Sequence, residues 1–276
     1  MVMLSFALDV SGDESRPVYT VAGFGSGEKD WKSFSELWTA RLGREGINYF
    51  RAAEAAHFRG QFKLFHDRPD REMWRQQLFA DLMGILRRNV YRQFGCSIIN
   101  SALNNMSEQL AEEFSLSALS LAGRTTEKHI RQWIIAEWTP TTPVVIVFEA
   151  GDQGIGKLQK RLAEDGSFPA TFRPKKDTLR NDGTMEYGYV PLQAADWLAY
   201  ELSIAIKQIE AGQIQEIAQL RWPMQEFFHI HGNPGVYATD NIQELETSLG
   251  TVKKINEWEK ATGLDQLRAK RRAGLG

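Results

Sequence analysis

A short apolar stretch near the middle of the chain, Pro143–Phe148 with the sequence PVVIVF, constrains the fold more than any other segment. After its proline it contains only valine, isoleucine and phenylalanine, which is typical of a strand buried on both faces of a sheet. Helices must then cover both sides of that sheet. The stretch runs directly into Glu149, so the pattern predicts an α/β layer with an acid at the end of a central strand.

The other segments fit this architecture. Apolar runs at 3–9 and 18–24 are separated by a spacer rich in Gly, Asp, Ser and Pro, which favours an antiparallel hairpin. Further strands are expected at 91–99 and near 170–173, and helices over about 28–43, 70–89, 155–164 and 191–210.

Two helical additions complete the expected organisation. Residues 1–212 form one domain with a helical insertion at about 105–138, broken at Gly123–Thr126, and residues 213–276 form a helical C-terminal extension packed on it. Within the extension, apolar residues over 238–260 recur at three- and four-residue steps. They predict a helix packed on the body, or alternatively a dimer seam.

Composition excludes several classes of protein. The net charge is −2, so any nucleic-acid footprint must be local rather than global. Cys96 is the only cysteine, which excludes a disulfide framework and a thiolate zinc cluster within one chain. No apolar run approaches the ~20 residues that a membrane span needs, and no signal peptide is recognisable. We therefore expect a cytoplasmic protein without a membrane partner.

Three acids stand where a purely structural sequence would seldom place them. Asp9 ends the first strand and Glu149 ends the buried central strand, with Asp152 close behind it. Asp196 falls on the border of the buried stripe of its expected helix. A carboxylate desolvated in such a position is costly unless it is paired or binds a cation.

Two strand-end acids and one helix-border acid form an arrangement that suits divalent metals. Carboxylate oxygens are the ligands that Mg²⁺ and Mn²⁺ prefer. Two such ions about 3.5–4 Å apart activate a water and stabilise the leaving oxygen of a phosphodiester. The alternative, for any single one of these acids, is ordinary duty in a turn or cap.

Four separate segments between residues 3 and 205 resemble the successive signatures of the domain-of-unknown-function family 3800. They are LDVSGDE, FRAAEAAHFRGQF, VFEAGDQGIGKL and PLQAADWLAYE. The resemblance implies a ribonuclease-H-like fold, in which a mixed sheet carries acids on its first strand, a central strand and a late helix. It also implies a setting in phage defence or mobile-element biology.

The family's acidic positions carry over onto this chain one by one. The first-strand acid is Asp9, and the central-strand acid is Glu149 with Asp152 beside it. The late-helix acid is Asp196, and the acid before the second helix is Glu54. The resemblance therefore implies that Asp9, Glu149, Asp152 and Asp196 bind metal and that Glu54 supports catalysis.

The chain departs from the family pattern at two positions. The family commonly has Glu directly after the first Asp, where this chain has Val10. It often has His before the acid of the second motif, where this chain has Arg51. Val10 gives weight to a catalytically inactive scaffold as the alternative to an enzyme.

Basic residues precede Asp196 in a polar loop. Lys175 and Lys176, with Arg173 just before them, are candidates to hold a substrate phosphate, although a solvated charged loop would look the same.

Together these patterns predict a metal-dependent nuclease that hydrolyses the phosphodiester bonds of RNA or DNA with Mg²⁺ or Mn²⁺. The alternative is an inactive ribonuclease-H-like scaffold that binds nucleic acid or a protein. The helical regions offer surfaces for a protein partner or a second copy of the chain.

Overall fold

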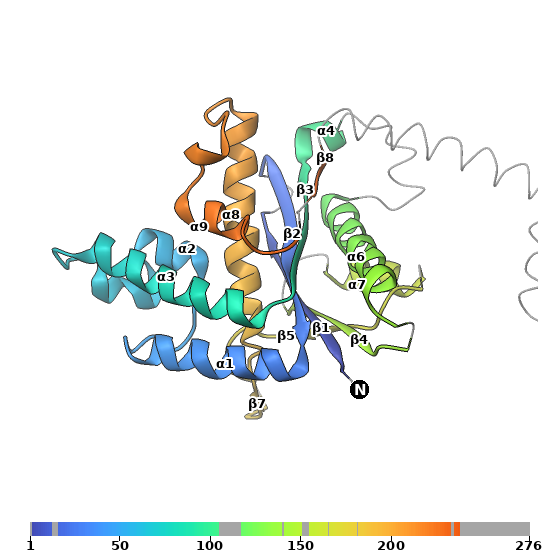
Figure 1. Ribbon diagram of the computed structural model, residues 1–276, viewed down its shortest axis with the longest axis horizontal. Coiled ribbons are helices and arrows are strands. Elements are labelled where there is room, and N and C mark those ends of the chain that lie inside the picture. Colours follow the sequence, from blue (N-terminus) through green and yellow to red (C-terminus); the bar gives the residue numbers. More distant parts are fainter. Residues whose placement is uncertain are drawn as a thin grey trace, which may run out of the picture.

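The computed structural model shows a mixed β-sheet between two layers of helices (Figure 1). The described residues are 2–12, 16–104, 117–139, 141–150, 155–164, 166–180, 182–232 and 235–237. The strands of the main sheet are β1 (Leu4–Ser11), β2 (Val18–Gly27), β3 (Arg92–Ile99), β4 (Val144–Glu149), β5 (Ala170–Arg173) and β8 (Gly235–Tyr237). A separate two-stranded ribbon consists of β6 (Thr178–Leu179) and β7 (Met185–Glu186).

Helices cover both faces of the main sheet. The α-helices are α1 (Glu28–Gly43), α2 (Ala52–His57), α3 (Arg71–Asn89), α4 (Asn100–Asn104), α6 (Ala118–Glu137), α7 (Ile155–Glu164), α8 (Pro191–Glu210) and α9 (Trp222–Phe227). Two 3₁₀ turns, η1 (Gly60–Phe65) and η2 (Ile217–Gln219), lie between them. Figure 1 shows α6 and α7 on one side of the sheet and α1, α2, α3, α8 and α9 on the other.

The sheet contains both antiparallel and parallel pairs of strands. Its order is β5-β4-β1-β2-β3-β8. The predicted hairpin is confirmed, since β1 and β2 are antiparallel, and β3 is antiparallel to β2. The strands β1, β4 and β5 are parallel to one another, which requires crossovers through the helices. The central position of β1 places its C-terminal end beside that of β4.

The pattern PVVIVF forms the expected interior strand, β4, and the helices over 28–43, 155–164 and 191–210 have the predicted bounds. The predicted break at Gly123–Thr126 is wrong, because α6 runs through it without interruption. A Cβ at Gly123 would lie 2.6 Å from the side chain of Leu158 in α7. This glycine therefore permits close helix packing rather than ending the helix.

The segment after residue 212 is not wholly helical. It contains η2 and α9, but it also contributes β8, which lies parallel to β3 at the edge of the main sheet. The expected helix over 238–260 lies outside the described residues. In the predicted insertion, α6 packs against β2 and β3 and so forms part of the helical layer on that face.

Among the helices that the structure describes, none has both the length and the apolar character needed to cross a membrane.

One carboxyl group lies inside the helical layer, away from the strand-end acids. Glu201 of α8 is 1% exposed, and its Oε1 lies 3.4 Å from Nη2 of Arg221. Its Oε2 has no hydrogen-bond partner among the described residues. Burial raises the pKa of Glu201 to about 7, although Arg221 opposes the shift. Glu201 therefore binds a proton more tightly in the folded protein than in the unfolded chain.

This linkage predicts that Glu201 destabilises the fold as the pH rises. The contribution of Glu201 to the free energy of unfolding is fully favourable below the pKa of the unfolded chain, 4.5. It is lost as the pH rises through the folded-state pKa of about 7. Replacing Glu201→Gln removes the titrating proton. The variant should gain up to about 3 kcal/mol relative to wild type between about pH 4 and pH 8. Urea unfolding at each pH measures the difference, and a constant difference would contradict the assignment.

Candidate functional site

The site forms where the parallel strands β1 and β4 end. Leu8 pairs with Phe148, so the next residue of each strand, Asp9 and Glu149, emerges at the same edge of the sheet. The period of two along β1 puts Asp9 on the same face as Ser5. Ser5 hydrogen-bonds the hydroxyl of Tyr189, two residues before α8, at 2.6 Å. Asp9 therefore faces the layer that contains α8.

Helix α8 brings the third acid to this edge. It packs against β1 and β2, and Pro191 stands at its start. Asp196 lies between the fully buried Ala195 and Trp197, but its own side chain remains 14% exposed. The border position that the sequence predicts for Asp196 is thus the observed one.

The ammonium of Lys175 joins the three acids. Lys175 follows β5 by two residues, and its Nζ lies 3.2 Å from Oδ2 of Asp9. The same nitrogen lies 2.6 Å from Oε2 of Glu149 and 2.7 Å from Oδ1 of Asp196. The ammonium donates hydrogen bonds to Asp9 and Asp196 and forms an ion pair with Glu149. We call these four residues the carboxylate–lysine cluster.

Two oxygens of the cluster have different environments. Oδ2 of Asp196 accepts a hydrogen bond of 2.6 Å from the backbone N–H of Ala52 at the start of α2. Oδ1 of Asp9 is buried and has no donor among the described residues. The Asp9 side chain is 1% exposed and that of Glu149 is 20% exposed. The cluster is therefore closed behind Asp9 and opens to solvent beside Glu149.

The cluster shifts the proton affinity of its members. Burial raises the pKa of Asp9 well above its usual range; the carboxyl groups of Asp196 and Glu149 raise it further, and Lys175 opposes them. Burial alone would lower the pKa of Lys175, but the three carboxyl groups raise it above its usual range. Lys175 therefore stays an ammonium, while a proton on Asp9 would reduce the excess negative charge around it.

Gln193, which the sequence reasoning missed, fixes the backbone around the cluster. Its Nε2 donates to the carbonyl oxygen of Lys175 at 2.9 Å. Its Oε1 accepts from Nε1 of Trp38 at 3.0 Å and from the backbone N–H of Phe50 at 2.8 Å. The available signal was a polar residue directly after Leu192, on the apolar face of the helix that carries Asp196.

The predicted phosphate-binding residues differ in how far their charges are engaged. The Lys175 ammonium forms ion pairs with all three acids of the cluster. Lys176 places its Nζ 4.5 Å from the centre of the Tyr49 ring. Arg173 lies over the Tyr189 ring at 5.1 Å and donates to the carbonyl oxygen of Tyr187 at 3.3 Å. These contacts connect the loop after β5 to the acids, to Tyr49 and to Tyr189.

Two further predicted residues lie outside the cluster or outside the described chain. Glu54 accepts a long hydrogen bond of 3.4 Å from the Tyr49 hydroxyl, and its carboxyl group lies against Gly60. Gly60 has a φ of +54°, and a Cβ there would lie 2.0 Å from Oε2 of Glu54. The contacts of Glu54 are thus with Tyr49, which precedes α2, and with Gly60 at the start of η1. Asp152 lies outside the described residues.

Val10 does not remove a ligand from the cluster. It pairs with Val21 in the β1–β2 hairpin and packs against the hydrophobic core. Because side chains alternate along a strand, Val10 faces the side of the sheet opposite Asp9. A glutamate at this position would point away from Lys175.

The donor chemistry of the cluster suits a divalent cation. It offers hard carboxylate oxygens, and the buried Oδ1 of Asp9 has an unused acceptor position. In the described part of the chain, however, no three His, Cys, Asp or Glu side chains are already arranged to hold a metal ion. The central position among the acids is taken by the Lys175 ammonium. The ligand types fit Mg²⁺ or Mn²⁺, and the present occupant is the chain's own cation.

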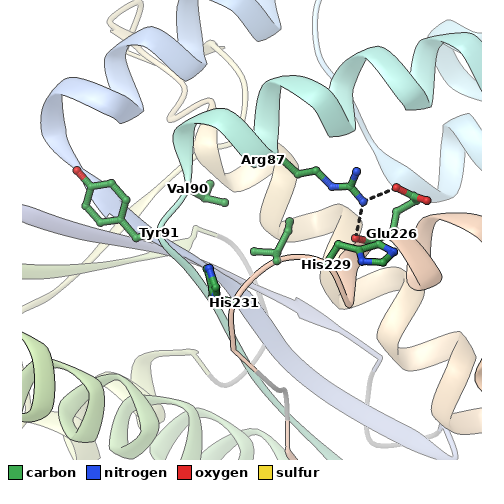
Figure 2. Close-up of a pocket in the computed structure, with 7 residues that line it drawn as sticks. Arg87, Val90, Tyr91, Glu226, His229 and His231 are labelled. Carbon is green, nitrogen blue, oxygen red and sulfur yellow. Dashed lines mark hydrogen bonds and ion pairs between the residues drawn. The ribbon is translucent and has the colours of Figure 1, made fainter.

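A cavity of about 520 Å³ lies elsewhere in the molecule. Figure 2 shows it between the C-terminal end of α3, the start of β3, and the turn after α9. The guanidinium of Arg87 there binds the carboxylate and the carbonyl oxygen of Glu226. These elements contribute nothing to the carboxylate–lysine cluster. The candidate site is the cluster, because three acids from separate elements converge there.

Comparison of the chain with models of known protein families and with curated proteins finds no match.

The contacts of Gln193 predict a large effect of its removal. Gln193→Leu leaves the N–H groups of Trp38 and Phe50 without an acceptor and the Lys175 carbonyl without a donor. The free energy of unfolding should fall by about 2–5 kcal/mol. The matched control is Gln208→Leu on the same helix, because Oε1 of Gln208 is buried without a partner among the described residues. Urea unfolding should show a much smaller loss for the control, and equal losses would contradict the prediction.

Proposed function

We propose that this chain is a metal-dependent phosphodiester hydrolase that acts on RNA or DNA in the cytoplasm, with a ribonuclease-H-like fold. One observation carries the proposal: Asp9, Glu149 and Asp196, which are far apart in sequence, all contact one cation at the end of the central strands. A convergence of three acids is costly for stability and is frequent at functional sites.

The order of the strands and the positions of the acids support a ribonuclease-H-like fold. The resemblance stated above implies a mixed sheet with acids on its first strand, a central strand and a late helix. The chain has a mixed sheet, and the three acids lie on β1, β4 and α8. The one departure within the first motif, Val10, faces away from the acids and leaves their number unchanged.

Asp9, Glu149 and Asp196 would hold Mg²⁺ or Mn²⁺, with Asp152 as a further candidate. Bound there, such ions would supply activation of water and polarisation of phosphate oxygens. The backbone N–H of Ala52 orients Asp196 through its Oδ2, so that Oδ1 faces the centre of the site. The burial of Asp9 excludes water from the rear of the site, and Glu149 lies at its solvent side.

A second candidate function is a scaffold without catalysis that binds nucleic acid or a protein. The observation in its favour is the ammonium of Lys175 at the centre of the acids, where it compensates their charge without any metal. In that case the cluster would serve the stability of the fold, and binding would use other surfaces.

The replacement Asp196→Asn separates the two functions. It keeps the size of the side chain and an oxygen for the N–H of Ala52, but it removes the negative charge. Cleavage of RNA or DNA in Mn²⁺ should fall by about 100-fold or more, because even the outer partners of metal ligands are worth 10–100-fold. Initial cleavage rates of labelled single- and double-stranded substrates measure the effect.

The control is Asp81→Asn on α3, where the carboxylate pairs with Arg41 at 2.7 Å on the surface. This variant should cleave at the wild-type rate. Cleavage that persists in Asp196→Asn would assign the activity to other residues. If the wild-type protein binds nucleic acid but does not cleave it in Mg²⁺ or Mn²⁺, the scaffold function is the correct one.

A further inference from the structure

We propose that Lys175 is an exchangeable internal cation: a divalent metal ion enters the site by displacing its ammonium from Asp9, Glu149 and Asp196. The inference rests on the metal site of the proposed function. It adds that the carboxylate–lysine cluster has two alternative occupants, of which one is part of the chain.

The geometry supports mutual exclusion. The ammonium uses one oxygen from each acid, and these three oxygens lie 2.6–3.2 Å from Nζ. A metal ion ligated by the same three oxygens would need the position that Nζ occupies. Two cations close together in a buried site also repel each other strongly. The metal therefore replaces the ammonium rather than joining it.

The unsatisfied atom of the cluster indicates that the ammonium is an incomplete partner. Oδ1 of Asp9 is buried in a residue that is 1% exposed, and no donor reaches it from the described residues. The ammonium donates to Oδ2 of Asp9 and Oδ1 of Asp196 and pairs with Oε2 of Glu149, and none of these contacts reaches Oδ1 of Asp9. A divalent ion accepts six or more oxygen ligands, so it has a coordination position for this oxygen as well.

The exchange requires a movement of the side chain alone. The carbonyl oxygen of Lys175 is held by Gln193 at 2.9 Å. The base of its loop is closed by the hydrogen bond from the Tyr189 N–H to the Pro174 carbonyl, at 2.7 Å. A lysine side chain is a flexible four-carbon stem with a point charge at its end. It can rotate away on the solvent side, where Glu149 is the most exposed of the three acids.

Chemical labelling of the wild-type protein tests the exchange directly. In metal-free buffer, Lys175 should resist acetylation by an amine-reactive ester, because its side chain is 8% exposed and its ammonium is paired with three acids. Lys176 is exposed and provides an internal reference in the same peptide. At saturating Mn²⁺ the acetylation rate of Lys175, measured by mass spectrometry, should rise by about 10-fold or more relative to Lys176. Continued protection of Lys175 at saturation would overturn the proposal.

A matched pair of variants tests the competition. Lys175→Met removes the internal cation, and Lys176→Met removes an adjacent charge that lies over the Tyr49 ring. Calorimetric titration should show Mn²⁺ binding at least about 10-fold tighter to Lys175→Met than to wild type, and unchanged for Lys176→Met. Mn²⁺ should also raise the melting temperature of Lys175→Met more than that of wild type. Equal or weaker binding by Lys175→Met overturns the proposal.

These measurements distinguish the exchange from the hydrolase. Tighter Mn²⁺ binding by Lys175→Met without cleavage by either protein would support the exchange and contradict the hydrolase. Metal-dependent cleavage by a wild-type protein whose Lys175 stays protected would overturn the exchange and leave the hydrolase intact. Absence of Mn²⁺ binding to both proteins would overturn the exchange, and the cleavage assay would still decide on the hydrolase.

Discussion

The ion pairs of the Lys175 ammonium with Asp9, Glu149 and Asp196 are the interaction on which the rest of this structure depends. Three carboxyl groups at one sheet edge repel one another, and removal of one partner from such a buried group costs about 3–5 kcal/mol. The negative charge of the three acids is balanced here by the Lys175 ammonium. The β1–β4 register and the position of α8 bring the acids together, and the loop after β5 brings the cation.

This charged cluster is supported by an aromatic core directly beside it. The ring of Trp38 in α1 lies 5.6 Å from that of Phe50, and Phe50 lies 5.3 Å from Trp197 of α8. Gln193 connects this core to the site, because its amide binds Trp38 and Phe50 on one side and the Lys175 backbone on the other. Large buried rings hold their positions tightly. They allow one amide to fix the backbone from which Lys175 extends.

Local patterns in the sequence predicted most of the framework but not the partners within the site. The strand PVVIVF and the hairpin before it follow from residue type and spacing, and the meeting of Asp9 with Glu149 follows from the parallel ends of two strands. The role of Lys175 depends instead on the path of a loop. A lysine in a polar loop suggests a solvated side chain or a phosphate contact, and only the tertiary structure shows the acids around Lys175.

Other differences between the sequence-based predictions and the structure also arise from tertiary packing. Gly123 resembles a helix break in the sequence, but the side chain of Leu158 in a neighbouring helix requires a residue without a Cβ there. The strand β8 is only three residues long and pairs with β3, more than a hundred residues earlier in the chain, so no local period reveals it. The sequence suggested a supporting role for Glu54 in the site, yet its carboxyl group lies against Gly60 and accepts a hydrogen bond from Tyr49.

A cation that is part of the chain has a consequence for both stability and function. Because Lys175 is tethered beside the acids, its ammonium loses no translational freedom on binding them and is present at a high effective concentration. In the proposed exchange, a dissolved metal ion would have to overcome this advantage with stronger bonds and with the additional ligand that the buried Oδ1 of Asp9 provides. The contacts that balance the acids without metal would then be the same contacts that reduce the affinity for metal. On this proposal, folded-state stability and metal affinity are opposed through one side chain.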